Sequence, residues 1–321
     1  MTGVGREPIF GLELSACFKY APCPKLSIAQ RGDVLKIQSL LVPFLAILAL
    51  GTATGCGDSH SVPPFTNLAF LSSPSAGQAT QLVSVKLADA TVAAIPSTNI
   101  NFYYPSSSAD FKLVAYESQG DPWVQNADGT GLLRLTNTGT NNFVRLFPNG
   151  KKVLYTDSGG HVLTIHVDGT AGTDLTPTLP TGITDCYSAG ISADSSQIVI
   201  VCEGASIFGI YTMKQDGTGL KTVLSRTTWT DTPSFSPDGS KIYFVATVSG
   251  VLTVESVKID GSGETVVIPA SYEAIVLNST LYYTFSDPVL NKTQVYKSKL
   301  DGTNPTSISN GISLDSLSLS N

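Results

Sequence analysis

A turn that begins with aspartate recurs along most of the chain, and its period constrains the fold more than any other feature. In five copies the aspartate is followed by glycine and then by threonine or serine, and a degenerate Asp-Ala-Thr copy precedes them. The six copies begin at Asp89, Asp128, Asp168, Asp216, Asp260 and Asp301, with spacings of 39, 40, 48, 44 and 41 residues. Such a period is typical of β-propeller blades, none of which can bury both faces of its sheet without neighbours. Six turns predict six blades.

The repeat that spans residues 232–269 shows why each unit is a sheet. Its Pro-Asp-Gly at residues 237–239 combines a preset φ with residues that tolerate positive φ, as a tight turn between antiparallel strands requires. The next run, residues 242–246, is apolar at every position, which indicates a strand that is buried on both faces. Residues 251–259 and 266–268 supply the third and fourth strands. We therefore expect an all-β fold of four-stranded antiparallel blades.

An open sandwich, or two small β domains, is the alternative that regular turns also allow. The strands of a sandwich should alternate between apolar and polar residues, whereas residues 197–202 and 281–285 do not. The pattern therefore favours the propeller.

The two ends of the repeat predict how the ring closes. Residues 68–95 offer the second, third and fourth strands of a blade with no first strand ahead of them, and residues 312–320 form a strand with no blade after it. We expect this C-terminal strand to join the N-terminal sheet and complete the sixth blade. Closure of this kind would remove two exposed sheet edges, which otherwise invite aggregation.

The segment before the repeat is typical of an export signal. Residues 40–50 are apolar apart from Pro43 and follow basic residues, but the run is shorter than the roughly 20 residues that span a membrane. Residues 53–56, Ala-Thr-Gly-Cys, resemble the lipobox of bacterial lipoproteins, which implies acylation of Cys56, although alanine stands where leucine is commonest. Secretion with an unmodified Cys56 thiol is the alternative.

These features divide the chain into four parts. We expect residues 1–33 to be an unstructured extension, or to lie upstream of the true translation start. Residues 34–55 would be the lipoprotein signal peptide, residues 56–64 a polar tether, and residues 65–321 the propeller.

Two cysteines fall inside the predicted propeller, Cys186 and Cys202. Their positions are symmetric about a hairpin turn expected at Asp194, so the two should face each other across neighbouring strands. Opposed residues at a non-hydrogen-bonded site lie about 4.5 Å apart at Cα, which is within the range that a disulfide accepts. The spacing predicts a disulfide, with a pair of buried thiols as the alternative.

Catalytic signatures do not stand out. His161 and His166 are an odd number of residues apart, which would direct them to opposite faces of one strand. The repeated aspartates belong to turns at the outer rim of a propeller, where they diverge, and no phosphate-binding glycine loop or nucleophile elbow occurs. We therefore assign no catalytic residue, metal ligand or cofactor.

The charge pattern also limits the possible partners. Only 14% of residues are charged, the formal net charge is −6 and no basic run occurs, which makes nucleic acid an improbable partner.

Function in a propeller usually resides on the loops that lead into each innermost strand. The side chains near these loops that could bind a ligand at the channel mouth are Tyr187, Trp229, Asp231 and Tyr272. Exposed aromatic rings with an acid would suit a peptide or a small polar ligand, and ordinary packing is the alternative explanation for each of them.

Residues 126–136 and 235–242 resemble the repeat of TolB-like propellers, which also occurs in relatives of prolyl oligopeptidase. The resemblance covers residues 65–321 and implies the fold. TolB has an additional N-terminal α/β domain, for which this chain has no room, and the oligopeptidases carry catalysis on a separate domain. A role in the Tol system is therefore not implied.

We expect a monomeric, non-catalytic propeller that binds an envelope protein or peptide and is held to the membrane through Cys56. Because Gly57 stands where aspartate retains many lipoproteins at the inner membrane, we expect the outer membrane, facing the periplasm. The alternative is a lactonase-like or sugar-processing enzyme with an acidic or metal site on the axis, to which only Asp231 and Glu273 could contribute.

Overall fold

The computed structural model describes residues 14–15, 25–26, 63–72, 81–99, 101–287 and 292–308. The chain divides into two units, residues 1–61 and 62–321. In the first unit, β1 (Leu14–Ser15) and β2 (Lys25–Leu26) form a short antiparallel pair. Among the described residues, no helix is long and apolar enough to cross a membrane.

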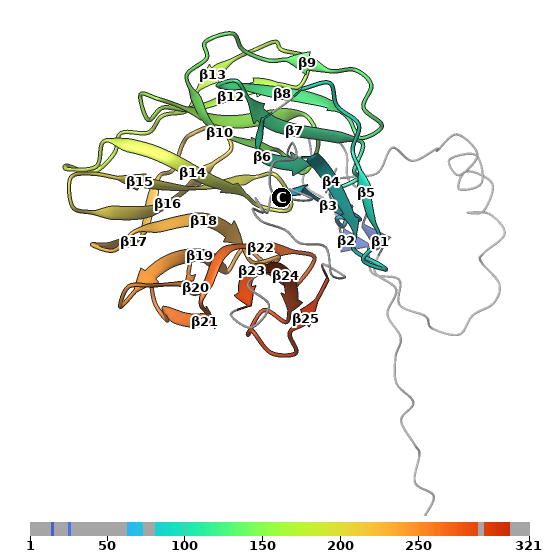
Figure 1. Ribbon diagram of the computed structural model, residues 1–321. Helices are drawn as coiled ribbons and strands as arrows, with labels where there is room; N and C mark the ends of the chain where they lie inside the picture. Colours follow the sequence, from blue (N-terminus) through green and yellow to red (C-terminus); the bar gives the residue numbers. More distant parts are fainter. Residues whose placement is uncertain are drawn as a thin grey trace, which may run out of the picture. The chain divides into compact units, whose positions relative to one another are not determined.

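The second unit is a six-bladed β-propeller, in which successive sheets follow one another around a common centre (Figure 1). The strands of each sheet follow sequence order and pair in antiparallel fashion. The first blade holds three described strands, β3 (Asn67–Ser72), β4 (Gln81–Lys86) and β5 (Val92–Ala94).

Each of the other five blades has four strands. The second blade comprises β6 (Phe102–Ser107), β7 (Leu113–Ser118), β8 (Asp121–Asn126) and β9 (Leu133–Arg134), and the third β10 (Asn141–Leu146), β11 (Lys152–Asp157), β12 (Val162–His166) and β13 (Thr173–Asp174). The fourth comprises β14 (Asp185–Ile191), β15 (Gln197–Glu203), β16 (Phe208–Lys214) and β17 (Lys221–Arg226). The fifth comprises β18 (Thr230–Phe235), β19 (Lys241–Val248), β20 (Val251–Lys258) and β21 (Thr265–Pro269), and the sixth β22 (Ser271–Leu277), β23 (Thr280–Asp287), β24 (Lys292–Ser298) and β25 (Thr306–Ser307).

The repeated aspartates form the turns between third and fourth strands, as the sequence predicts. Asp168 is typical: its Oδ1 accepts hydrogen bonds from the Thr170 backbone N–H (2.9 Å) and the Thr170 hydroxyl (2.6 Å). Gly169 follows with a φ of 79°, which an L side chain rarely adopts. The aspartate therefore acts as a turn former through local hydrogen bonds.

Among the described residues, no strand occupies the innermost position of the first blade. The Leu87 N–H donates to the Thr66 carbonyl (2.9 Å), as the Ala127 N–H donates to the Lys112 carbonyl (2.9 Å) ahead of β7 in the second blade. β3 is therefore equivalent to the second strand of the other blades, as expected. The predicted first strand of this blade, residues 312–320, lies outside the described residues.

The first and last blades are neighbours in the ring. Phe65 and Leu68 share a hydrophobic core with Ile275 and Tyr282 of the sixth blade. The Phe65 N–H also donates to Asn278 Oδ1 (2.9 Å), and Asn278 Nδ2 donates to the Phe65 carbonyl (2.6 Å). These contacts join residues that are 213 positions apart in sequence, so the ends of the ring meet by packing between blades.

Candidate functional site

The first strands of blades two to six share one irregularity, a bulge near their start, where we expect the mouth of the ring. Their pairing with the second strand shifts register between Tyr103 and Ser106 in β6, and again near the start of β10, β14, β18 and β22. Bulges bend a strand and redirect its side chains. Two of the residues within them, Tyr104 and Thr232, have positive φ values of 49° and 47°.

Counting back from the turn to the second strand identifies equivalent positions in the five blades. The position farthest from the turn holds Tyr103, Asn142, Tyr187, Asp231 and Tyr272. Three of the four residues that we predicted at the mouth therefore lie at the same sequence distance from the turn. Asp231 pairs with Val245, whereas Tyr187 and Tyr272 fall inside the bulges. The fourth, Trp229, directly precedes β18 and is partly exposed, and its carbonyl accepts a hydrogen bond from the Thr247 N–H (3.1 Å).

The tyrosines differ in how far they remain available to a ligand. Tyr103 and Tyr272 are 54% and 51% exposed. Tyr187 instead packs against the core of the fourth and fifth blades, and its hydroxyl donates to the Thr230 carbonyl. Burial raises the pKa of Tyr187, and the charge of Asp231 raises it further. Tyr187 therefore ties two blades together, whereas Tyr103 and Tyr272 present their rings to solvent.

Asp231 lies at the edge of the hub beside a positive charge. Burial raises its pKa above the ordinary value, and the Ser188 hydroxyl, the Thr232 N–H (2.6 Å from Oδ1) and the Arg145 charge oppose that rise. Because burial dominates, Asp231 holds its proton more tightly than an exposed aspartate does. A protonated carboxyl can donate a hydrogen bond as well as accept one.

Arg145 is the residue of this site that sequence reasoning missed. It occupies a register position that is Ser106, Gly190, Ser234 and Ile275 in the other blades. Its residue is 4% exposed, and its guanidinium carbon lies 5.0 Å from the centre of the Phe143 ring. A positive charge inside the apolar run of residues 143–147 was the signal that could have found it.

The guanidinium of Arg145 is incompletely satisfied. Its Nε and Nη1 are buried and have no hydrogen-bond partner among the described residues. Burial lowers the pKa of Arg145 to about 10, and the charges of Asp231, Glu273 and Tyr104 oppose this. The group nevertheless keeps its charge at neutral pH. Tyr104 is 39% exposed and packs its ring 5.3 Å from that of Phe143, so a stack of three side chains leads from solvent to Arg145.

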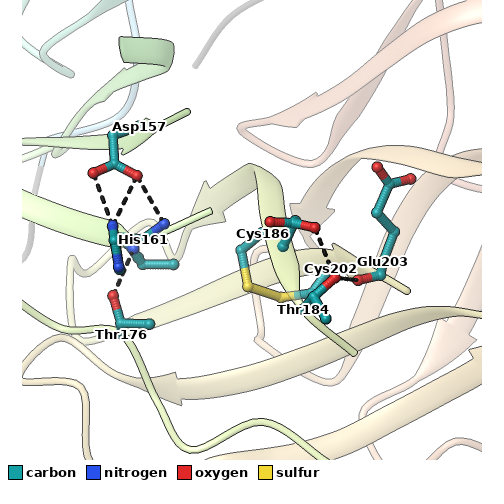
Figure 2. The surroundings of a disulfide bond; sticks show 9 residues. Asp157, His161, Thr176, Thr184, Cys186, Cys202 and Glu203 are labelled. Atoms are coloured by element: carbon teal, nitrogen blue, oxygen red, sulfur yellow. Dashed lines mark hydrogen bonds and ion pairs between the residues drawn. A yellow bond between two sulfur atoms is a disulfide. The ribbon is translucent and has the colours of Figure 1, made fainter. Parts of the chain in front are cut away.

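A disulfide fixes the start of β14 next to the mouth. Cys186 and Cys202 are direct cross-strand partners with Cα atoms 3.9 Å apart, and their sulfur atoms are bonded (Figure 2). Thr184, just before β14, donates from its backbone N–H to the Glu203 carbonyl (2.8 Å). Because Tyr187 directly follows Cys186, the disulfide holds the bulge of β14 in place.

The loop into β10 is held by a buried carboxylate. Asp121 forms an ion pair with Arg134 and accepts hydrogen bonds from the Thr138 N–H (2.9 Å), the Gly139 N–H (3.2 Å) and Asn141 Nδ2 (3.1 Å). Burial would raise the pKa of Asp121, but hydrogen bonds from the Thr136 hydroxyl, from Arg134 and from the N–H groups of residues 138 and 139 outweigh it, and the pKa lies below its ordinary value. The strand that carries Arg145 thus begins from a rigid loop.

A cavity of about 230 Å³ lies at the opposite end of the first strands, among the turns that lead to the second strands. Its lining includes Pro148, Pro237 and Asn278 from these turns, together with Pro63 and Pro64. The end of the predicted tether therefore meets the propeller on the face opposite the mouth.

Metal-ligand geometry is absent from the described part of the chain, where no three His, Cys, Asp or Glu side chains lie close enough to hold an ion together. His161 directly precedes β12, and His166 is its last residue. His161 Nδ1 contacts Asp157 Oδ2 at 2.9 Å (Figure 2). Cys56 lies outside the described residues.

No protein-family model matches this chain, and no curated protein matches it in sequence. Solved structures do resemble it. TolB from Acinetobacter baumannii has 17% identity and a TM-score of 0.63, covering 88% of this chain and 72% of that one. A TolB protein from Agrobacterium tumefaciens has 18% identity and a TM-score of 0.58, covering 76% and 88%. Oligogalacturonate lyase from Vibrio parahaemolyticus has 14% identity and a TM-score of 0.51, covering 75% and 71%. The chain thus shares the six-bladed propeller fold of the TolB structures.

Proposed function

We propose that this protein is a lipid-anchored propeller of the bacterial cell envelope that binds a protein or peptide at the mouth of its ring, without catalysis. The exposed tyrosines at the mouth carry the proposal. Tyr103 and Tyr272 are exposed by half or more, at a site where function concentrates in propellers. Tyrosine gives a large contact area at low entropic cost, which suits the recognition of a polypeptide.

The position of the tether supports the anchoring part of this proposal. Cys56 is nine residues ahead of Phe65, so it can lie at most about 30 Å away along an extended chain. Because Pro63 and Pro64 line the cavity opposite the mouth, the tether would join the propeller on that face and leave the mouth free for a partner. The membrane would be the outer membrane, with the propeller a monomer in the periplasm.

Affinity capture tests the binding function. The full chain, purified with its anchor and immobilised, is exposed to detergent-solubilised envelope, and captured proteins are identified by mass spectrometry. We expect the double variant Tyr103→Ala/Tyr272→Ala to lose the captured partner. The control is Leu133→Ala/Val266→Ala, which removes two exposed apolar side chains of outer strands. Equal capture by both double variants would refute the proposal.

The anchor is tested separately by mass spectrometry of the mature N-terminus. We expect a diacylated or triacylated Cys56, and we expect the Cys56→Ser variant to leave the membrane fraction. A Cys56 recovered as a free thiol would refute the anchor and leave the mouth proposal standing.

A propeller enzyme is the second candidate, since the fold also resembles that of oligogalacturonate lyase. Asp231, Glu273 and Arg145 supply acidic and basic groups near the axis. Turnover of a panel of lactones and acidic oligosaccharides, abolished in Asp231→Asn, would favour this candidate over the scaffold.

A further inference from the structure

The described propeller contains three arginines, and two of them bind a carboxylate of the chain itself. Arg134 pairs with Asp121 and lies 5.8 Å from the Trp123 ring. Arg226 pairs with Glu255 (2.6 Å) and lies 5.7 Å from the Phe244 ring. In each case one face of the guanidinium covers an aromatic ring while its edge meets a carboxylate.

Arg145 lies over an aromatic ring, but no carboxylate of the described residues forms an ion pair with it. It lies over Phe143 as the other two lie over their rings. Its Nε and Nη1, which lie on different edges of the guanidinium, have no hydrogen-bond partner in the described part of the chain, although the residue is 96% buried. An unpaired buried charge destabilises the fold, because burial removes the hydration of the ion without replacing it by hydrogen bonds. A group that comes from outside would offset this cost.

Register shows that the fold does not require an arginine here. Ser106 and Ser234 stand at the equivalent positions, and their hydroxyls accept hydrogen bonds from the Leu146 N–H (2.8 Å) and the Val276 N–H (3.1 Å) of the next blade. Gly190 is also equivalent, and a Cβ there would lie 2.2 Å from the Pro233 carbonyl oxygen. Three of the five blades therefore place a small side chain at this position and blade six places Ile275, so blade three alone places a cation in it.

We propose that Arg145 binds a carboxylate of the ligand at the base of the mouth, and that this ligand is a peptide segment with an acidic group. The inference rests on the proposed binding function and names the chemistry of its ligand. Arginine matches the planar geometry of a carboxylate with two parallel hydrogen bonds. The exposed Tyr103 and Tyr272 would contact the rest of the segment, and the partly exposed Tyr104 begins the stack that ends at Arg145.

The surrounding acids fit this assignment. Asp231 lies near the Arg145 charge and burial raises its pKa, which disfavours its charged form, and the Thr232 hydroxyl also has no partner among the described residues. Glu273 adds a negative charge near Arg145, so a ligand with an acidic group and a neighbouring N–H would suit the site better than a simple anion.

The Nε–H signals of arginine provide a direct test. The full chain is labelled with [15N]arginine, and the Arg145 signal is assigned as the one missing from Arg145→Lys. The probes are three equimolar mixtures of acetylated pentapeptides whose random positions omit aspartate and glutamate. One mixture has free C-termini, one has C-terminal amides, and one consists of amides with glutamate at the central position. We expect at least one carboxylate-bearing mixture to shift the Arg145 signal downfield. The signals of Arg134 and Arg226, which already bind carboxylates, should stay in place.

The three mixtures identify the source of the carboxylate. A response to the free C-termini alone assigns a terminal carboxylate, and a response to the glutamate amides assigns a side-chain carboxylate. No response of Arg145 to any mixture would overturn the inference. A response only to galacturonate oligomers, run as a fourth probe, would overturn the assignment of the ligand as a peptide.

Variants separate a binding role from a structural one. We expect Arg145→Met to bind the responding mixture at least about tenfold more weakly, since a charged hydrogen bond is lost, while its melting temperature is unchanged or higher. Retained affinity, or a melting temperature that falls together with affinity, would overturn the inference. If Tyr103→Ala/Tyr272→Ala loses the captured envelope partner and Arg145→Met keeps it, the inference fails while the proposed function stands.

Discussion

In four of the five Asp-Gly turns the glycine has two roles, and only one of them is visible in the sequence. Its positive φ belongs to the turn itself. The second role is contact between blades: a Cβ on Gly261 would lie 2.5 Å from the Val223 carbonyl oxygen in the preceding blade, and one on Gly302 would lie 2.5 Å from that of Val267. Close approach to the outer edge of the preceding blade is therefore a second requirement for glycine in these four turns, whereas Gly169 has only a distant contact with Leu133.

Two alanine substitutions separate these roles. Gly239, in the turn after β18, has a φ of 67° and open space around its Cβ position, whereas Gly261 has a φ of 83° and the close carbonyl. Each substitution should cost roughly 1–2 kcal/mol for the left-handed conformation. Gly261→Ala should cost more, because the blades must also move apart. Urea denaturation measures both, and equal losses would show that the interblade contact does not restrict the side chain.

The pH dependence of stability should report on Asp231. Its folded pKa is raised, so the folded state binds the proton more tightly than the unfolded state and loses stability as pH rises through that pKa. Asp231→Asn removes this loss. The variant should therefore be more stable than the parent at pH 7 and equally stable below the ordinary aspartate pKa of about 4. Denaturant midpoints between pH 3 and 8 test this, and a constant difference across the range would contradict it.

At the scale of strands, the bulges at the start of the first strands create the mouth. A regular strand would direct alternate residues to opposite faces, so the side chains from Tyr103 to Ser106 would keep strict alternation. The register shift in β6 breaks it, and the equivalent shift in β14 lies directly beside the disulfide. Bulges follow from packing around a hub, so the turn spacing that predicts the strands does not predict them.

Removal of the disulfide should lower the stability of the fold and loosen the bulge of β14 at the mouth. Cys186→Ala/Cys202→Ala opens a loop with a sequence separation of 16 residues and should lower the free energy of unfolding by about 3 kcal/mol. Guanidinium denaturation without reductant measures the loss. The parent treated with reductant is the control and should fall to the stability of the variant. A parent that is insensitive to reductant and alkylated at two thiols before treatment would contradict the prediction.

For the whole molecule, the ring is held where its two ends meet. Phe65 and Asn278 join the first blade to the last, and a shared core continues the contact. The first blade has three described strands, and its innermost strand remains the prediction that residues 312–320 supply it. An unpaired inner edge in one blade would weaken both of its neighbours.

Truncation tests this closure. A chain that ends at Ile308 should melt about 10 °C or more below the parent, because each kcal/mol lost shifts the midpoint by roughly 2–4 °C in a domain of this size. Deletion of residues 1–33 is the matched control and should leave the midpoint unchanged. Equal midpoints for the parent and the C-terminal truncation would show that the ring closes by blade packing alone.

The sequence by itself determined the blade count, the turns between strands and the pairing of Cys186 with Cys202, because each depends on contacts between residues close in the chain. Turn chemistry and continuous apolar runs act within one repeat, so their pattern is legible without a structure. Only the tertiary structure decided which side chains meet at the hub, because Arg145, Asp231 and Glu273 come from three blades and their electrostatic environment exists only once the ring forms. For the same reason, sequence reasoning identified Tyr272 and Asp231 as candidate site residues and missed Arg145.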